Sequence, residues 1–552
     1  MKKYFYMTKK WFIRCLVLAS IGLGLGFVVP ANHFEITKNA ELFVNIVHQL
    51  ESYYVDEINP DKFIKTGVDA MMASLDPYTV YVSEEEMDGF KIQTTGKYGG
   101  IGALISSKDN NIIVAEPYQG YPAAKNDLRA GDIILEIDGI KVKGKKTDEV
   151  SRMLKGQPGT PVKILLQRLN EPKPLSLTLL RQEIKLSSVP YFGMLSPQVG
   201  YIVLADFTDN CYFEVANALQ ELKNTHKATS IILDLRGNPG GLLDEAVNVA
   251  SLFLNNGQTV VYTKSRNREG DKYYKTDREP IDNNIPLAVM IDRGSASAAE
   301  IVAGVIQDTD RGIVLGNRSF GKGLVQTTHP LPYDTKLKIT TGKYYLPSGR
   351  CIQAIDYSGG YRDNLDKVAD SLRTAYKTKN GRKVLDAGGI DPDITIPEFE
   401  YSLITSSLLQ KELIFDYATL FRTKNETIPQ PEEFELTEAQ LNDFFAYIKD
   451  KSYDYLTESE KLLKDLQKNI ENEKYLPLVK DDMQKLENQI QHDKLNDLQK
   501  YKSEIKFALE HEIAMRYFFH KGQIKEMLED DPVVIKALQA LNDKTTYQKL
   551  LN

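Results

Sequence analysis

The chain has 552 residues, a length that corresponds to about three or four domains. Hydrophobic residues make up 42% of it, enough to build several buried cores. Its net charge of −7, with no basic cluster beyond the N-terminus, argues against a nucleic-acid-binding protein. The three cysteines, Cys15, Cys211 and Cys351, exclude a disulfide framework and leave open one Cys211–Cys351 bridge. No ligand spacing typical of zinc occurs, so we expect neither a metal nor another cofactor.

The N-terminus combines a basic start with a short apolar segment. Four lysines precede Trp11, and an apolar run then extends to Val29, interrupted by Arg14. The part after Arg14 is shorter than the roughly 20 residues that a helix needs to span a bilayer. Residues 1–31 are therefore predicted to be an export signal cleaved near Ala31, or an uncleaved signal anchor.

Residues 32–89 are predicted to be helical. Apolar residues between Leu42 and Leu50 recur at mixed helical spacing, and Phe63–Leu75 continues the pattern. Such a region can pair two protomers in a homo-oligomer or pack within one chain. The sequence leaves both alternatives open.

Residues 90–183 form a predicted self-contained unit of short strands. A glycine-rich segment leads into the first strand, and Thr147–Leu154 has the apolar spacing of a helix. The predicted strands occupy residues 103–105, 111–116, 133–137 and 162–167. This order of elements resembles a PDZ domain.

PDZ domains bind peptide C-termini by strand addition, and loop amides hold the terminal carboxylate. The resemblance implies a carboxylate-binding loop followed by an apolar pocket for the last side chain. The loop residues would be Gly99, Gly100, Ile101 and Gly102, and the pocket residues Val150 and Leu154. We therefore expect protein or peptide partners with free C-termini. The alternative is a domain that packs within the chain and binds nothing.

Ser297 lies where a predicted strand passes into a predicted helix. Ile285–Ile291 is a short apolar run, and Ala298–Ile306 has an apolar helical face. A serine at this place lies near the unpaired amides of the first helical turn. Such amides, that of Ala298 for example, can stabilise an oxyanion. Lys322, in a second segment of small residues, can serve as its base if the amine is neutral.

A glycine-rich loop follows another predicted strand, Ser230–Leu233. It ends in Gly240 and Gly241, which permit backbone conformations and close approaches that other residues forbid. One of these glycines is a candidate for the second oxyanion amide, and the sequence does not choose between them. A tight turn without chemistry is the alternative.

Several segments in the same order resemble the carboxyl-terminal processing peptidases, serine endopeptidases of the tail-specific type with a Ser-Lys dyad. The resemblance extends over about residues 35–400. Its segments are 75–79, 235–241, 295–304, 320–326, 344–350 and 389–393. It implies a catalytic core related to the Clp protease and crotonase fold, with Ser297 as nucleophile and Lys322 as general base. Gln326 matches the glutamine that orients the lysine amine in this family.

Other polar residues near these motifs have simpler interpretations. His329 is the only histidine close to them in sequence, so a histidine-dependent protease is a weaker alternative. Glu300 falls in the first turn of the predicted helix, where the helix dipole favours a carboxylate. Arg236 is expected to brace the glycine loop. We interpret both residues as structural.

The sequence as a whole predicts an α/β multidomain protein. It would consist of a signal (1–31), a helical region (32–89), an inserted PDZ domain (90–183), a protease core (184–400) and charged helices (401–552). Those helices pack on the core, mediate oligomerisation or bind a partner; the sequence does not decide. Our hypothesis is an exported serine endopeptidase of the bacterial envelope, on the periplasmic side, that cleaves proteins near their C-termini and works with or without an activating adaptor. The main rival is a PDZ scaffold with an inactive protease core.

Overall fold

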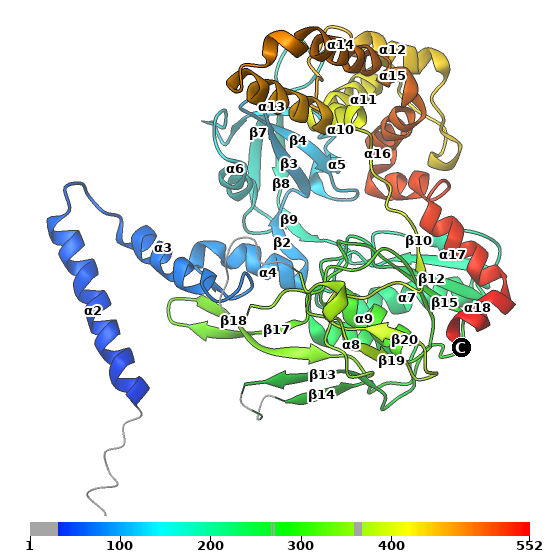
Figure 1. Cartoon of the computed structure of the whole chain (residues 1–552). Coiled ribbons are helices and arrows are strands. Elements are labelled where there is room, and N and C mark those ends of the chain that lie inside the picture. The colour runs from blue at the N-terminus through cyan, green and yellow to red at the C-terminus, as the bar shows by residue number, and fades with distance from the viewer. Residues whose placement is uncertain (1–30, 267, 269–270, 358–366) are drawn as a thin grey trace, which may run out of the picture. The chain divides into compact units, whose positions relative to one another are not determined.

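The computed structural model describes residues 31–266, 268, 271–357 and 367–552 (Figure 1). The chain divides near residue 81 into two parts, each of which is treated by itself. The predicted signal lies outside the described residues, apart from Ala31. Among the helices that are described, none combines the length and apolarity needed to cross a membrane.

The N-terminal part contains α2 (Ala31–Tyr53) and α3 (Pro60–Ala73), as predicted for most of residues 32–89; the same range also contains a short strand, β1 (Val80–Val82), which was not predicted. Asn59 caps α3, because its side chain accepts a hydrogen bond from the Lys62 amide (3.0 Å), and Pro60 occupies the first turn. Within this part, no side chain of α3 is buried.

The predicted PDZ region is an antiparallel sheet that buries one face on two short helices. The strands pair in the order β3-β4-β5-β7-β8, and β6 pairs with β5. Their bounds are β3 (Ala103–Lys108), β4 (Asn111–Pro117), β5 (Ile133–Ile137), β6 (Ile140–Lys141), β7 (Pro161–Gln167) and β8 (Leu175–Leu180), with helices α5 (Pro122–Lys125) and α6 (Thr147–Leu154). A separate pair, β2 (Lys97–Gly100) and β9 (Gln182–Lys185), joins the start and end of the region.

The catalytic region is built on a six-stranded sheet, in which the first strand pair is antiparallel and the remaining pairs are parallel. The order is β10 (Phe192–Met194), β11 (Val199–Val203), β12 (Ser230–Asp234), β15 (Leu287–Ile291), β16 (Ile313–Gly316) and β21 (Ile394–Thr395). One face packs on α7 (Cys211–Asn224), α8 (Leu243–Ser251) and α9 (Ala298–Asp308). Strands buried on both faces explain the apolar runs in the sequence, and the predicted α/β class is confirmed.

A second sheet contains the hairpin of β17 (Leu324–Leu331) and β18 (Thr335–Tyr345). β18 also pairs with β13 (Thr259–Ser265), which pairs with β14 (Lys272–Lys275). A small hairpin of β19 (Ala375–Lys377) and β20 (Lys383–Leu385) follows. Lys322 lies just before the first of these hairpins, and its amide donates to Glu300 in the first turn of α9 (2.9 Å).

The C-terminal region forms two different packings. The helices with a shared core are α10 (Leu403–Gln410), α11 (Leu413–Lys424), α12 (Glu438–Ile448) and the first half of α16 (Lys502–Met527), beside the more exposed α13 (Glu458–Asn472), α14 (Leu476–Leu495) and α15 (Asp497–Lys500). In contrast, α17 (Pro532–Asn542) and α18 (Lys544–Leu551) cover the second face of the catalytic sheet (Figure 1). Of the three roles left open by the sequence, packing on the core is therefore observed.

The two cysteines within the described residues are free thiols. Cys211 begins α7 and is buried, and Cys351 is half-buried. Burial raises the pKa of both thiols. The bridge left open by the sequence is not formed.

The packing of α17 on the sheet can be tested by placing a charge on each of its two sides. Val534 is 1% exposed in the core beneath α17, whereas its neighbour Ile535 is 41% exposed. We expect Val534→Asp to lower the free energy of unfolding by at least about 3 kcal/mol, because it buries a carboxylate in apolar surroundings. Ile535→Asp should cost less than about 1 kcal/mol. Urea unfolding followed by circular dichroism measures both; equal losses would contradict this packing.

Candidate active site

The turn that carries Ser297 is held in an unusual conformation. Ser297 has φ of 54° and ψ of −112°, a region that residues other than glycine rarely adopt, and it directly precedes α9. Two hydrogen bonds fix the turn to the glycine loop: Ser295 Oγ donates to the Leu235 carbonyl (2.8 Å), and the Ala296 amide donates to the Asn238 carbonyl (2.9 Å). Strained backbone of this kind is typical of functional sites.

A single buried carboxylate connects the backbones of Ser297 and Lys322. Glu300 Oε2 accepts hydrogen bonds from the amides of Ser297 (2.8 Å) and Lys322 (2.9 Å). Its Oε1 accepts from the Gly321 amide (2.8 Å) and from the Ser319 hydroxyl. The carboxylate therefore fixes the Ser297 turn relative to the Lys322 segment, a role that the sequence did not reveal.

Tyr344 forms a second connection between the same two segments. Its hydroxyl lies within hydrogen-bonding distance of the carbonyls of Ser297 (3.2 Å) and Lys322. The ring is buried in the core beneath α9. The sequence placed Tyr344 only in a family segment, because nothing local indicates which carbonyls its hydroxyl reaches.

Burial has a large effect on Glu300. It raises the pKa of this carboxyl group to about 7, although the donated hydrogen bonds oppose the shift. Since the pKa is higher in the folded than in the unfolded chain, Glu300 favours folding most at low pH. That contribution is lost as the pH rises from about 4.5 to about 7.

The glycine loop lies directly against Ser297. A Cβ atom on Gly240 would lie 2.8 Å from Ser297 Cβ and 2.9 Å from the Ala298 amide nitrogen, so only glycine fits there. The Gly240 amide donates to Asn238 Oδ1 (2.8 Å). The amides of Gly241 and Ala298, by contrast, donate to no group in the part of the chain that the structure describes.

Gln326 and His329 both lie on β17. Gln326 follows a bulge in this strand and donates from Nε2 to Thr340 Oγ1 (3.2 Å); its predicted role in orienting Lys322 stays a prediction. His329 is exposed, and its side chain makes no hydrogen bond or ion pair with any described residue. This environment gives no support to a histidine base.

The four residues predicted to form a peptide-binding loop divide between a strand and a turn. Gly99 and Gly100 belong to strand β2 and pair with β9, so their placement in a loop was wrong. They are glycines because of crowding: a Cβ atom on Gly99 would lie 2.1 Å from the Gly156 carbonyl oxygen.

Ile101 and Gly102 form the actual turn before β3. Their carbonyls accept from the amides of Ala123 and Tyr118 (both 2.8 Å), while their own amides have no partner among the described residues. β3 pairs only with β4 within the described sheet, so its outer edge is open to an added strand.

The predicted pocket residues belong to the domain core. Val150 is 0% exposed and Leu154 is 4% exposed, and both pack in the same apolar cluster as Ile101 and Ile105. Both residues belong to α6, which packs against β3. Their peptide-binding role stays a prediction.

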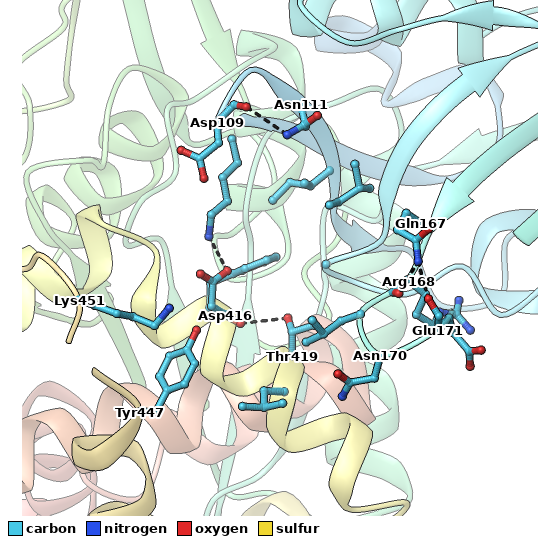
Figure 2. A pocket seen from close by; sticks show the side chains of 17 residues that line it. Asp109, Asn111, Gln167, Arg168, Asn170, Glu171, Asp416, Thr419, Tyr447 and Lys451 are labelled. Atoms are coloured by element: carbon cyan, nitrogen blue, oxygen red, sulfur yellow. Dashed lines mark hydrogen bonds and ion pairs between the residues drawn. The ribbon is translucent and has the colours of Figure 1, made fainter. Parts of the chain in front are cut away.

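A cavity of about 620 Å³ lies elsewhere, between turns of the PDZ region and helices α11 and α12 (Figure 2). None of the predicted site residues lines it. At its edge, Lys108 forms ion pairs with Asp416 and with Glu412 (3.2 Å). A Cβ atom on Gly131 would lie 2.5 Å from Thr419 Cγ2, which shows how closely the two regions approach.

The comparisons with known proteins agree with this arrangement. Family models match residues 198–359 ("Peptidase family S41"), 113–168 ("PDZ domain") and 404–541 ("Probable PDZ-protease, C-terminal helical domain"). The chain is 36% identical over 347 residues to the carboxy-terminal-processing protease of Bartonella bacilliformis, covering 61% of this chain and 79% of that protein.

A second relative, from Staphylococcus aureus, is named "Probable CtpA-like serine protease"; it is 34% identical, and the alignment covers 57% of this chain and 62% of that protein. Among solved structures, the photosystem II D1 C-terminal processing protease aligns at 27% identity with a TM-score of 0.35, over 64% of this chain and 92% of that chain.

The fold and the matched segments define a serine protease that carries a PDZ domain. The chain belongs to peptidase family S41. The predicted enzyme class, a serine-type C-terminal processing peptidase, is thereby confirmed.

Glu300 can be tested with an isosteric amide. In Glu300→Gln, an amide nitrogen replaces one of two oxygens that face only donors, so we expect kcat/KM to fall by roughly 100-fold as the active-site geometry shifts. The difference in free energy of unfolding between wild type and variant should shrink as the pH rises from about 4.5 to about 7, and then level off.

The control is Glu458→Gln, which changes an exposed glutamate in the first turn of α13. It should alter neither activity nor the pH dependence of stability. Unchanged activity in a folded Glu300→Gln enzyme would show that the carboxylate does not hold the site together.

Proposed function

We propose that Ser297 and Lys322 form a catalytic dyad that cleaves protein substrates near C-termini captured by the PDZ domain. The observation that carries this proposal is the bridge through Glu300, since one buried carboxylate binds the backbone amides of both residues. Two segments held by the same group keep a fixed separation, as a nucleophile and its base require.

The chemistry follows the usual acyl-enzyme course. The neutral Lys322 amine takes the Ser297 hydroxyl proton as Oγ attacks the scissile carbonyl, and the resulting ammonium gives that proton to the leaving amine. Water then repeats the sequence on the acyl-enzyme and releases the new C-terminus. A lysine can work in this way only while its amine is neutral.

The oxyanion of the tetrahedral intermediate needs two donors. We assign them to the amides of Ala298 and Gly241, because both lack a partner in the described part of the chain, whereas the Gly240 amide is bound to Asn238. Gly240 has a different role: its missing side chain lets the loop approach Ser297.

Substrate capture is assigned to the turn of Ile101 and Gly102 and to the outer edge of β3. The free amides of the turn fit a terminal carboxylate, and the open strand edge fits an extended peptide. The buried positions of Val150 and Leu154 imply that the side-chain pocket opens only as a peptide enters.

Export to the bacterial envelope is part of the same proposal. Its support is the basic start and the apolar segment before Ala31. The rival function, a PDZ scaffold with an inactive core, predicts peptide binding without cleavage, so cleavage of a protein substrate by the wild-type chain separates the two.

We expect Ser297→Ala and Lys322→Ala each to lower kcat/KM at least about 10³-fold, because neither residue can complete the proton transfer alone. Lys322→Arg should fail as well, since a guanidinium stays protonated. His329→Gln is the control and should retain full activity. The measurement is cleavage of a protein substrate by enzymes whose circular dichroism spectra match; a folded Lys322→Ala enzyme with near-normal turnover would exclude the dyad.

Recognition of the C-terminus can be tested on the substrate. Amidating the terminal carboxylate removes the group that the Ile101–Gly102 turn is proposed to bind, so we expect KM to rise about tenfold. A free-carboxyl peptide should compete with substrate, and its amidated twin should not. If only KM changes, the PDZ domain tethers substrate; if kcat at saturation also falls, it gates the site. Equal cleavage of both forms would reject C-terminal recognition.

A further inference from the structure

The glycine loop, residues 235–241, contacts the start of the C-terminal helix α17. Arg236, within this loop, donates from Nη2 to Asp234 (2.7 Å), and the same nitrogen lies 2.7 Å from Asp531 Oδ2. Asp531 is the N-cap of α17, and its other oxygen, Oδ1, accepts from the amides of Val533 (2.8 Å) and Val534 (3.2 Å). Each oxygen of Asp531 therefore has its own role.

The ion pair is part of a closed, largely buried network. Asp234 also accepts from the Arg236 amide (2.9 Å) and from the Tyr201 hydroxyl (2.6 Å). Burial opposes a charge on Arg236, but the carboxylates of Asp234 and Asp531 outweigh it and hold the pKa above its ordinary value. A guanidinium bound on both sides has little freedom to move.

The loop that carries Arg236 is the one that meets the nucleophile. Leu235 and Asn238 accept from the Ser297 turn, and the Gly237 amide donates to Asp292 Oδ1 (2.8 Å). A shift of Arg236 therefore moves the peptide groups that run toward Gly241. An oxyanion donor that is displaced by a fraction of an ångström stabilises the transition state much less.

We infer that Asp531 is a positioning residue for catalysis: through Arg236, the start of α17 fixes the glycine loop and its oxyanion amide opposite Ser297. This inference rests on the proposed Ser-Lys function. It makes the C-terminal helices part of the active-site scaffold as well as a cover for the sheet.

The test uses the separate roles of the two oxygens. Asparagine is as good an N-cap as aspartate, so Asp531→Asn keeps the cap of α17 but turns an NH₂ group toward Arg236. The matched control is Asp543→Asn at the N-cap of α18, where Asp543 Oδ1 likewise accepts from two amides, those of Thr545 and Thr546 (3.0 and 3.1 Å). Its other oxygen accepts from the Thr546 hydroxyl (2.6 Å), and within the described residues it binds no arginine.

We expect Asp531→Asn to lower kcat about 10- to 100-fold with KM within about twofold, and to slow labelling of Ser297 by a fluorophosphonate to a similar extent. Asp543→Asn should leave both rates unchanged. Thermal melting of the full-length variants should show that Asp531→Asn is as well folded as the control.

The outcomes separate this inference from the proposed function. If wild type is not labelled at Ser297, or if Ser297→Ala remains active, the proposed function itself fails. If wild type behaves as proposed and Asp531→Asn matches it while Asp531→Ala loses activity, Asp531 acts only as a helix cap and the inference is overturned. If Asp531→Asn changes KM but not kcat, the inference is also wrong.

Discussion

Four donors converge on the buried carboxylate of Glu300, and the geometry of the site depends on them. A carboxylate without exposure is costly unless each oxygen is hydrogen-bonded, and here each oxygen accepts twice. The arrangement can form only when the start of α9 and the segment from Ser319 to Lys322 have both reached their final positions. Formation of the site is therefore nearly all-or-none, because a partly formed site would leave the buried Glu300 carboxylate without some of its hydrogen-bond donors.

The layering of the catalytic sheet explains why a distant C-terminal segment takes part. A parallel sheet must be covered on both faces, and α7 to α9 cover only one. The other face is covered by α17 and α18. The N-cap of α17, Asp531, lies beside the end of strand β12. β12 ends at Asp234, and the loop that follows carries Arg236; the ion pair to Asp531 is a consequence of where the covering helix begins.

The sequence predicted what local patterns can encode. Ser297 between a strand and a helix, and the glycine loop after β12, follow from apolar runs bounded by small residues. The pairing with Lys322 was predicted from side-chain chemistry together with the family resemblance. The loop assignment of Gly99 and Gly100 failed because glycine serves close approach as well as turns. The burial of Val150 and Leu154 was not predictable either, since a helix face toward a core and one toward a groove are equally apolar.

Long-range polar contacts were not predictable at all. The position of Glu300 has a sufficient local explanation in the helix dipole, and that of Asp531 in helix capping, so neither residue signals a second role. Their partners lie in other segments, where only the assembled fold brings them together. Sequence reasoning therefore identifies reactive side chains more readily than the groups that hold them in place.

The C-terminal helical region also contacts both β3 and the glycine loop. Lys108, at the end of β3, is ion-paired to Asp416 in α11 and to Glu412 at its N-cap, so β3 is anchored to the helical cluster that also contains the first half of α16. The helical conformation of α16 is interrupted at Phe519, where φ is 58°. The chain then continues to Asp531, which contacts the glycine loop through Arg236. Under the proposed function, the stretch 412–531 thus contacts the strand that receives the peptide through Glu412 and Asp416, and the loop that stabilises the oxyanion through Asp531.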